Sequence, residues 1–192
     1  MMLAAFADPV FDSQRTFREL LQAMARPAVP RRLPVLPPSP APVMPEAMAI
    51  VLTLCDATTT LWLQQPNAEV AEHLRFHAGL RLADQVQQAD FALIDDPTSM
   101  PALEGFARGD LRYPDRSASL IVQVEGFRTD RGPRFAGPGI RHTEMLAIEG
   151  LQDGFWRQRA ALSAQLPLGV DLYFVAAQHV VAMPRTTRLL EG

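Results

Sequence analysis

One stretch near the end of the chain, Val170–Ala177, restricts the possible folds more than any other part of the sequence. Asp171 is its only charged residue. Both alternating sets of side chains are largely apolar: Val170, Leu172, Phe174 and Ala176 in one, Tyr173, Val175 and Ala177 in the other. A strand that is apolar on both faces is usually covered on both faces. The stretch therefore predicts the middle of a layered α/β sheet.

A second apolar run, Val180–Met183, follows after a short polar break, and the two runs together predict a hairpin. The break at Gln178-His179 lacks the Asn-Gly or Gly-rich chemistry of a tight two-residue turn, so the turn type stays open. Pro184 has no N–H to offer a neighbouring strand. The strand pairing is therefore expected to end there.

Three polar residues, Arg185, Thr186 and Thr187, come directly after this proline. A guanidinium group is a fork of hydrogen-bond donors, and ligands of open α/β sheets bind beyond strand ends. The three residues are therefore candidate ligands for an anion. The alternative is a solvated exit from the sheet, because arginine and threonine are common surface residues.

All 18 basic residues of the chain are arginines. A pyridoxal-phosphate (PLP) enzyme needs a lysine Schiff base, and a Walker A loop needs its phosphate-binding lysine. The sequence therefore excludes both kinds of chemistry and predicts no cofactor. An anion site in this chain has to be built from arginine, hydroxyl groups or backbone N–H groups.

The overall composition favours one cytoplasmic domain spanning residues 1–192. The chain is 48% hydrophobic, carries a net charge of −3 and has scattered arginines, which argues against nucleic-acid binding. Its longest apolar run, around residues 48–54, is far shorter than the ~18 residues of a membrane span. No cationic segment precedes Leu3–Phe6, so no signal peptide is expected. Cys55 is expected to be a small buried hydrophobic residue.

The N-terminal third is expected to be a helix, a crossing segment and a second helix. Phe17, Leu20, Leu21 and Met24 have the spacing of one buried helical face, with Asp12 or Ser13 as the cap and Pro27 as the end. Eight of 17 prolines lie between Pro27 and Pro45, which predicts an extended crossing at about residues 27–46. We expect a structural crossing or a partner contact there, rather than an SH3-type ligand. Residues 46–55 fit a helix better than a strand.

The remaining elements follow from periodicity and turn residues. Strands are expected at 61–63, 91–94, 119–124 and 134–140, and helices at 67–77, 100–108 and 153–166. Asp95 and Asp96 are interpreted as a turn and helix cap rather than as an acid–base pair, because neighbours after a strand point in opposite directions. The sequence thus predicts a three-layer α/β/α fold with a central mixed sheet.

Two further groups of residues are candidate sites. His73 and His77 have the i, i+4 spacing of two metal ligands on a helix, but no third ligand is identifiable, so no metal site is expected. If this helix has a functional role, Arg75 and His77 are the candidates. Gly137-Pro138-Gly139 is either a backbone cradle for a phosphate or a type II turn.

Four segments resemble the PhnH family of phosphonate-metabolism proteins, whose members are subunits of the bacterial carbon–phosphorus lyase complex. The segments are Phe11–Pro27, Leu74–His77, Phe135–Ile140 and Pro167–Thr187. In the third of them, Gly137 and Gly139 are candidate ligand contacts. The resemblance implies a fold similar to the large domain of PLP-dependent transferases without the cofactor.

The same resemblance implies a homodimer when the protein is made alone, and PhnG, PhnI and PhnJ as partners. In the implied reaction, the subunit PhnL assists these proteins. The implied function is a contribution to alpha-D-ribose 1-methylphosphonate 5-triphosphate synthesis from ATP and methylphosphonate with release of adenine. No residue is implied to be catalytic, and an accessory role is expected. Two alternatives stay open: a stand-alone small-anion-binding or degenerate transferase-fold protein, and a purely structural interaction subunit.

Overall fold

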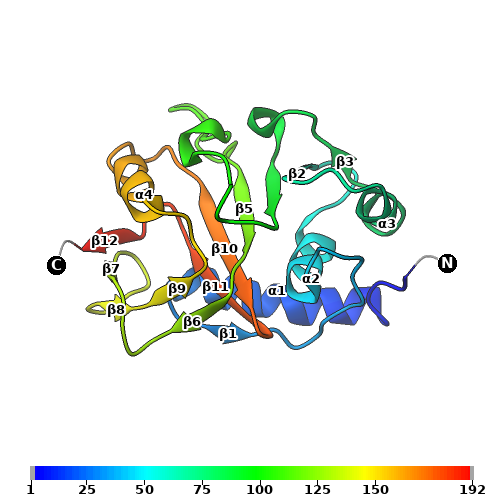
Figure 1. Cartoon of the computed structure of the whole chain (residues 1–192), viewed down its shortest axis with the longest axis horizontal. Helices are drawn as coiled ribbons and strands as arrows, with labels where there is room; N and C mark the ends of the chain where they lie inside the picture. The colour runs from blue at the N-terminus through cyan, green and yellow to red at the C-terminus, as the bar shows by residue number, and fades with distance from the viewer. Residues whose placement is uncertain (1–2, 191–192) are drawn as a thin grey trace.

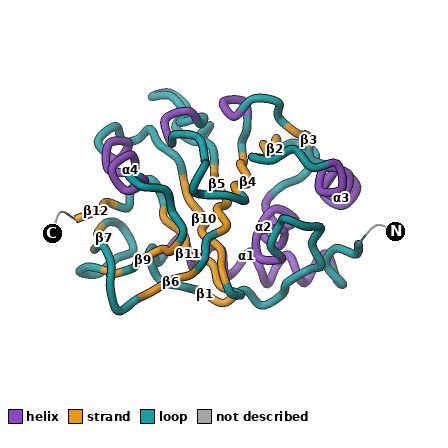
Figure 2. Tube along the Cα trace, viewed as in Figure 1, coloured by secondary structure: helices purple, strands orange, loops and turns teal. Residues whose placement is uncertain are grey.

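The computed structural model describes residues 3–190 and shows a mixed α/β fold around one large sheet (Figures 1 and 2). Seven strands lie in the order β1-β11-β10-β5-β4-β2-β3. Their bounds are β1 Arg31–Arg32, β11 His179–Met183, β10 Asp171–Ala176, β5 Ser119–Gln123, β4 Phe91–Ile94, β2 Thr60–Leu63 and β3 Arg81–Leu82. The strands from β10 to β3 are parallel, whereas β11 and β1 are antiparallel to their neighbours. The predicted mixed central sheet is therefore confirmed.

Strand β10 lies in the interior of this sheet between β5 and β11, as its apolar pattern predicted. Leu172 and Phe174 join one buried cluster, whereas Tyr173 and Val175 join the other. Side chains of β5, β4 and β11 alternate between the same two clusters, because successive residues of a strand point to opposite faces. The protein therefore has two apolar layers, one on each face of the sheet.

Three helices cover one face of the sheet: α1 (Pro9–Ala25), α2 (Pro45–Leu54) and α3 (Ala68–Ala78) (Figure 1). Helix α2 begins with Pro45 in its first turn, and the Asn67 side chain caps α3 by accepting from the Val70 N–H at 3.0 Å. Gly79 ends α3 in the left-handed conformation. The helices predicted at 46–55 and 67–77 are thus confirmed.

The opposite face is covered by helix α4 (Phe155–Ser163) and by two small sheets. The first has the order β12-β7-β8, with β12 Arg188–Leu190, β7 Arg134–Ala136 and β8 Glu144–Met145. The second pairs β6 Gly126–Arg128 with β9 Ala147–Glu149. The helix predicted at 153–166 is confirmed but shorter: it buries Phe155 and Leu162 and ends at Ser163, so Leu166 lies outside it and is 41% exposed. This layer therefore combines strands with one helix instead of being purely helical.

Helix α1 differs from its prediction at both its start and its buried face. It starts at Pro9 and is capped by Asp8, whose carboxylate accepts from the Val10 and Phe11 N–H groups. Leu20 is buried as expected, but Phe17 and Leu21 are 48% and 56% exposed. The inner face consists instead of Asp12, Thr16, Leu20 and Ala23. The apolar residues do recur at helical spacing, but the helix face predicted to be buried was wrong. Small and polar side chains form the buried face, and they let α1 approach the layer beneath.

Other predicted bounds were also wrong. No helix occupies 100–108, because only residues 103–105 form a 3-10 turn there, η2 (Leu103–Gly105), after the Asp96 turn. Another 3-10 turn, η1 (Val86–Gln88), precedes β4. The strand predicted at 134–140 ends at Ala136, because the chain turns at Pro138-Gly139. The hairpin is confirmed, but its turn residues are Ala177 and Gln178, both with positive φ as in a type I′ turn.

The proline-rich segment crosses the helical face of the sheet and is fixed there by a side chain of β5. Gln123 accepts from the Met44 N–H at 2.6 Å and donates to the Pro42 carbonyl at 3.2 Å. Within the segment, Arg31–Arg32 adds the edge strand β1 beside β11.

Cys55 is buried, which raises the pKa of its thiol to about 12 and confirms its hydrophobic role. Among the described residues, no helix combines the length and apolarity needed to cross a membrane.

Candidate functional site

The residues that follow β11 are engaged in the fold. The Arg185 Nη2 atom lies 2.6 Å from Asp171 Oδ2, and its backbone N–H donates to Asp171 Oδ1 at 2.7 Å. Its Nη1 group donates to the carbonyl oxygen of Pro114. Both side chains of the ion pair are only 17% exposed. The guanidinium group therefore ties the end of β11 to the start of β10, and its donors already have acceptors.

The glycine loop packs against this same junction. A Cβ on Gly137 would lie 2.9 Å from the Thr186 carbonyl oxygen, and one on Gly139 would lie 2.2 Å from the Ala25 carbonyl oxygen. The Ile140 N–H donates to the Gly137 carbonyl at 3.1 Å, and Gly139 has a φ of +85°. These features define a type II turn, which was one of the two structures predicted for Gly137-Pro138-Gly139. The glycines are needed here for close backbone packing.

Thr187 is 2% exposed, and its Oγ1 atom has no hydrogen-bond partner among the described residues. Its backbone N–H donates to the Pro184 carbonyl at 2.9 Å, closing the turn after β11. The structure thus brings Arg185, Thr186, Thr187, Gly137 and Gly139 together. They form a packed junction in which the Thr187 Oγ1 atom is buried without a partner among the described residues.

A second arginine of this junction was not singled out from the sequence. Arg159 of α4 is 2% exposed and donates to the carbonyl oxygens of Val170 and Pro184. Burial is the main cause that lowers its guanidinium pKa to about 10, and Asp171 acts in the opposite direction. Its position on the inner stripe of α4 was visible in the sequence. An arginine on the apolar stripe of the expected helix was the sequence signal that could have identified it.

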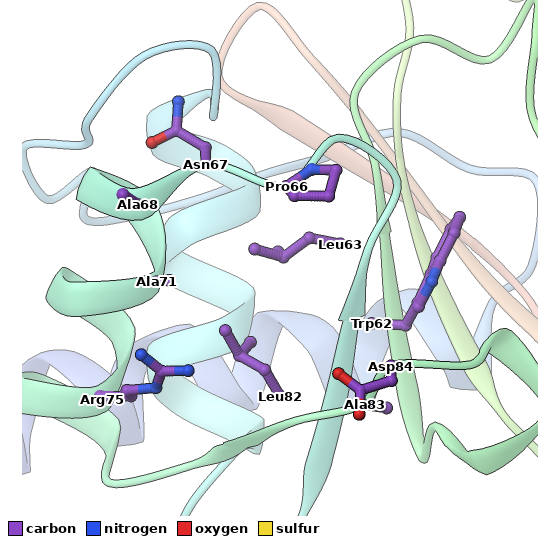
Figure 3. Close-up of a pocket in the computed structure, with 10 residues that line it drawn as sticks. All are labelled: Trp62, Leu63, Pro66, Asn67, Ala68, Ala71, Arg75, Leu82, Ala83 and Asp84. Carbon is purple, nitrogen blue, oxygen red and sulfur yellow. The ribbon is translucent and has the colours of Figure 1, made fainter.

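Arg75 lies elsewhere, on α3, and lines an open pocket of about 450 Å³ (Figure 3). The pocket lies between α3 and the ends of β2 and β3. Leu63 and Leu82 supply apolar walls, and Arg75 and Asp84 supply opposite charges without forming an ion pair with each other. Its other lining residues are Trp62, Pro66, Asn67, Ala68, Ala71 and Ala83.

This pocket has the general properties of a small-molecule site. Its volume falls within the roughly 300–1,000 Å³ of ligand pockets, and its walls are mostly apolar with a few polar groups. It adjoins the carboxyl ends of the parallel strands β2 and β3, where α/β sheets bind ligands. Leu82, Ala83 and Asp84 were missed from the sequence, because they follow a strand of only two residues. The pocket has room for a small organic anion whose negative charge lies beside Arg75.

His77 is not part of that pocket. Its Nε2 atom lies 3.0 Å from the Leu3 carbonyl oxygen, so it fastens the N-terminal segment to α3. The ring centroids of His73 and His77 are 4.5 Å apart. His73 is buried, and its pKa is lowered by desolvation first and then by the nearby His77. No group of three metal-binding side chains occurs among residues 3–190.

The two acids after β4 form a turn, as expected, but they cap no helix, because only a 3-10 turn lies within residues 100–108. The Asp96 carboxylate accepts from the Thr98 N–H and from the Ser99 hydroxyl, and such hydrogen bonds lower its pKa. Burial raises the pKa of Asp95 instead. The Gln64 side-chain amide donates from Nε2 to the Asp96 carbonyl oxygen and accepts at Oε1 from the Asp96 N–H. The pair is thus built into the connection between β2 and β4.

Comparisons with known proteins match nearly the whole chain. A family model described as "Bacterial phosphonate metabolism protein (PhnH)" matches residues 4–190. The "Alpha-D-ribose 1-methylphosphonate 5-triphosphate synthase subunit PhnH" of Rhizobium meliloti (strain 1021) is 37% identical over 187 residues, covering 96% of this chain and 94% of that protein. The "Putative C-P lyase subunit protein HtxG" of Stutzerimonas stutzeri is 32% identical over 176 residues, covering 92% and 85%.

Proposed function

Since the chain belongs to the PhnH family of bacterial phosphonate-metabolism proteins, we propose that it is a subunit of the carbon–phosphorus lyase complex. In this role it contributes to the synthesis of alpha-D-ribose 1-methylphosphonate 5-triphosphate from ATP and methylphosphonate, with release of adenine. The observation that carries this proposal is the 37% identity to a synthase subunit over 96% of the chain. Both relatives are named as subunits, which supports a component of an assembly.

The role within the assembly is accessory. Two observations support this proposal. Arg185, the most obvious anion ligand in the sequence, is paired with Asp171 and a carbonyl oxygen. His77 contacts a backbone carbonyl, and Asp96 contacts turn residues. The side chains that chemistry at a strand end would use are thus engaged in holding the fold.

The partners that we propose are PhnG, PhnI and PhnJ. The test is co-expression of this chain with these three subunits, followed by capture through a tag on PhnJ and by size-exclusion chromatography. Recovery of this chain in one peak with the tagged subunit is expected. Separate elution of this chain at every protein concentration used would contradict the assignment of partners.

Made alone, the chain is proposed to form a homodimer. The expected mass is roughly 42 kDa, twice the 21.2 kDa of one chain. Multi-angle light scattering over micromolar concentrations measures this mass directly. A constant mass of one chain over that range would count against the dimer.

We also propose that residues 1–192 fold as one domain whose sheet is related to the large domain of PLP-dependent transferases. Two apolar clusters packed on opposite faces of one sheet support a single folding unit. The parallel block from β10 to β3 supports the relation to transferases. A single unfolding transition seen by two probes is expected for one domain. An experimental structure with another strand order would contradict the proposed relation.

A second candidate function is binding of a small organic anion, which the pocket at Arg75 favours. Titration with methylphosphonate, followed by ligand-observed NMR, is the direct test. If the pocket binds it, Arg75→Gln should weaken binding at least fivefold, since a charged hydrogen bond is worth roughly 1.5–3 kcal/mol. The matched control is Arg112→Gln, an exposed arginine outside the pocket. Equal binding by both variants would remove this candidate.

A further inference from the structure

The outward face of α1 carries large apolar side chains that no other part of residues 3–190 covers. Val10, Phe17 and Leu21 lie on one line along the helix, at spacings of seven and four residues. They are 72%, 48% and 56% exposed, and Phe11 beside them is 64% exposed. Helix α1 lies along one side of the molecule (Figure 1). We call these four residues the α1 patch.

The α1 patch is about as large as the largest apolar patch of an ordinary monomer. If a whole aromatic side chain contributes about 150–250 Å², its four side chains expose roughly 400 Å² together. The largest apolar patches of ordinary monomers reach about 300–600 Å² and are often functional. A standard protein interface buries about 800 Å² on each partner. The α1 patch supplies about half of that area, as the apolar centre of an interface.

Exposed arginines flank the α1 patch along the helix, and one exposed acid, Asp8, lies at its N-terminal end, where its carboxylate caps the helix. Arg15 and Arg18 are exposed on the row of side chains next to it, at four and seven residues from Phe11. The two acidic residues of α1 are not available on this face, since Asp12 is buried and Glu19 pairs with Arg31 at 2.8 Å. Arg15 reaches Asp12 only at 3.9 Å and keeps 59% of its side chain exposed.

A groove beside α1 extends this basic edge. It has a volume of about 450 Å³ and is lined by Arg15, Arg32, Leu33, Pro34, Leu36 and Gln178. Arg32 contributes a second guanidinium group, which bonds to the neutral Gln178 amide at 3.0 Å. No acidic residue lines this groove. The groove therefore suits a carboxylate placed beside apolar side chains.

We propose that the α1 patch and this groove dock another protein chain whose surface is apolar at its centre and acidic at its edge. A second copy of this chain fits poorly. In a two-fold dimer the same surface lies on both sides, so Arg15 and Arg18 near the middle of α1 would approach their own counterparts. Like charges placed opposite each other disfavour association. Arginine and aromatic side chains are enriched at protein–protein interfaces, and acidic groups on the partner would complement these arginines.

This inference rests on the proposed function, because the partner is another subunit of the lyase complex. The test uses the co-expressed complex with a tag on PhnJ and measures how much of this chain is captured. One variant combines Phe17→Gln with Leu21→Gln, and a second combines Arg15→Glu with Arg18→Glu. Matched controls change exposed residues away from α1: Leu111→Gln with Leu166→Gln, and Arg112→Glu with Arg141→Glu.

Both α1 variants are expected to reduce capture at least tenfold, while both controls are captured like the wild-type chain. The loss in the Arg15/Arg18 variant should follow ionic strength, because salt screens surface charges. Each isolated variant should keep the thermal midpoint and the light-scattering mass of the wild type, since the substituted side chains point to solvent.

Two results would overturn the inference while leaving the proposed function intact. One is wild-type capture of both α1 variants. The other is a change of the isolated chain from dimer to monomer in the α1 variants, which would make a second copy the occupant. Failure of the wild-type chain itself to be captured would overturn the proposed function, and this inference with it.

Discussion

Arg185 illustrates how one residue type can support two opposite predictions. An arginine after a buried strand was a candidate ligand for an anion, with a solvated position as the alternative. The structure corresponds to neither, because the side chain is 17% exposed and paired with Asp171. The acid was visible in the sequence at position 171, but their contact depends on the hairpin that returns β11 alongside β10.

The structural role of Arg185 predicts a stability effect. Arg185→Gln should lower the free energy of unfolding by about 2–3 kcal/mol, because it leaves the poorly solvated Asp171 carboxylate without its charged partner. Urea unfolding measures this loss. The control is Arg128→Gln at a pair whose arginine is 54% exposed, where a loss below about 1 kcal/mol is expected. Equal losses in both variants would contradict the role assigned to Arg185.

His73 gives a prediction about pH. Its pKa in the folded protein is lowered from 6.5, first by desolvation and then by His77. The unfolded chain therefore binds the proton more tightly, so stability is lost as pH falls below about 6.5. His73→Gln should flatten this part of the stability–pH curve, measured by urea unfolding between pH 7.5 and 5.5. His142→Gln, at an exposed position, serves as the control and should keep the wild-type slope.

At the scale of elements, Gln123 is a buried polar side chain at the end of the apolar strand β5, and its role depends on the tertiary fold. It holds the proline-rich crossing through Met44 and Pro42. Gln123→Leu should cost about 1–2 kcal/mol, because a part-buried N–H and a carbonyl lose their partners. Hydrogen exchange at Met44 should accelerate more than at Val122 of the same strand. Unchanged protection of Met44 would argue against this anchoring role.

The sequence allowed prediction of the elements whose signal is local. The two-sided apolar pattern located β10, Asn67 located the start of α3, and Pro184 located the end of β11. Strands β3 and β8 have two residues each, too few to show a period. The buried face of α1 was wrong for another reason. Periodicity shows that apolar residues share a face, but not whether that face meets the core or another chain.

The candidate sites were predictable to a different degree. The residues after β11 and the glycine loop do lie together, but packing leaves Arg185 without free donors. Arg75 was predicted only as a candidate residue on its helix, without the pocket that it lines in the structure. That pocket is assembled from β2, α3 and the residues after β3, so its geometry exists only after the sheet has formed. Local sequence carries no signal for such a combination.

At the scale of the whole molecule, the fold, the exposed α1 patch and the family membership all agree with a component of an assembly. One face of the sheet is closed by helices, and the other by α4 and two small sheets. Apolar surface of a size that is often functional is left on the outside of α1. The central claim is that this chain works only together with its partners.

Adenine release from ATP and methylphosphonate tests this claim most directly. Chromatography can follow it for this chain alone, for PhnG, PhnI and PhnJ with PhnL, and for all five proteins together. The account predicts no release by this chain alone, release by the complete set, and a marked decrease when this chain is left out. Adenine release by this chain alone, or undiminished release without it, would contradict the account.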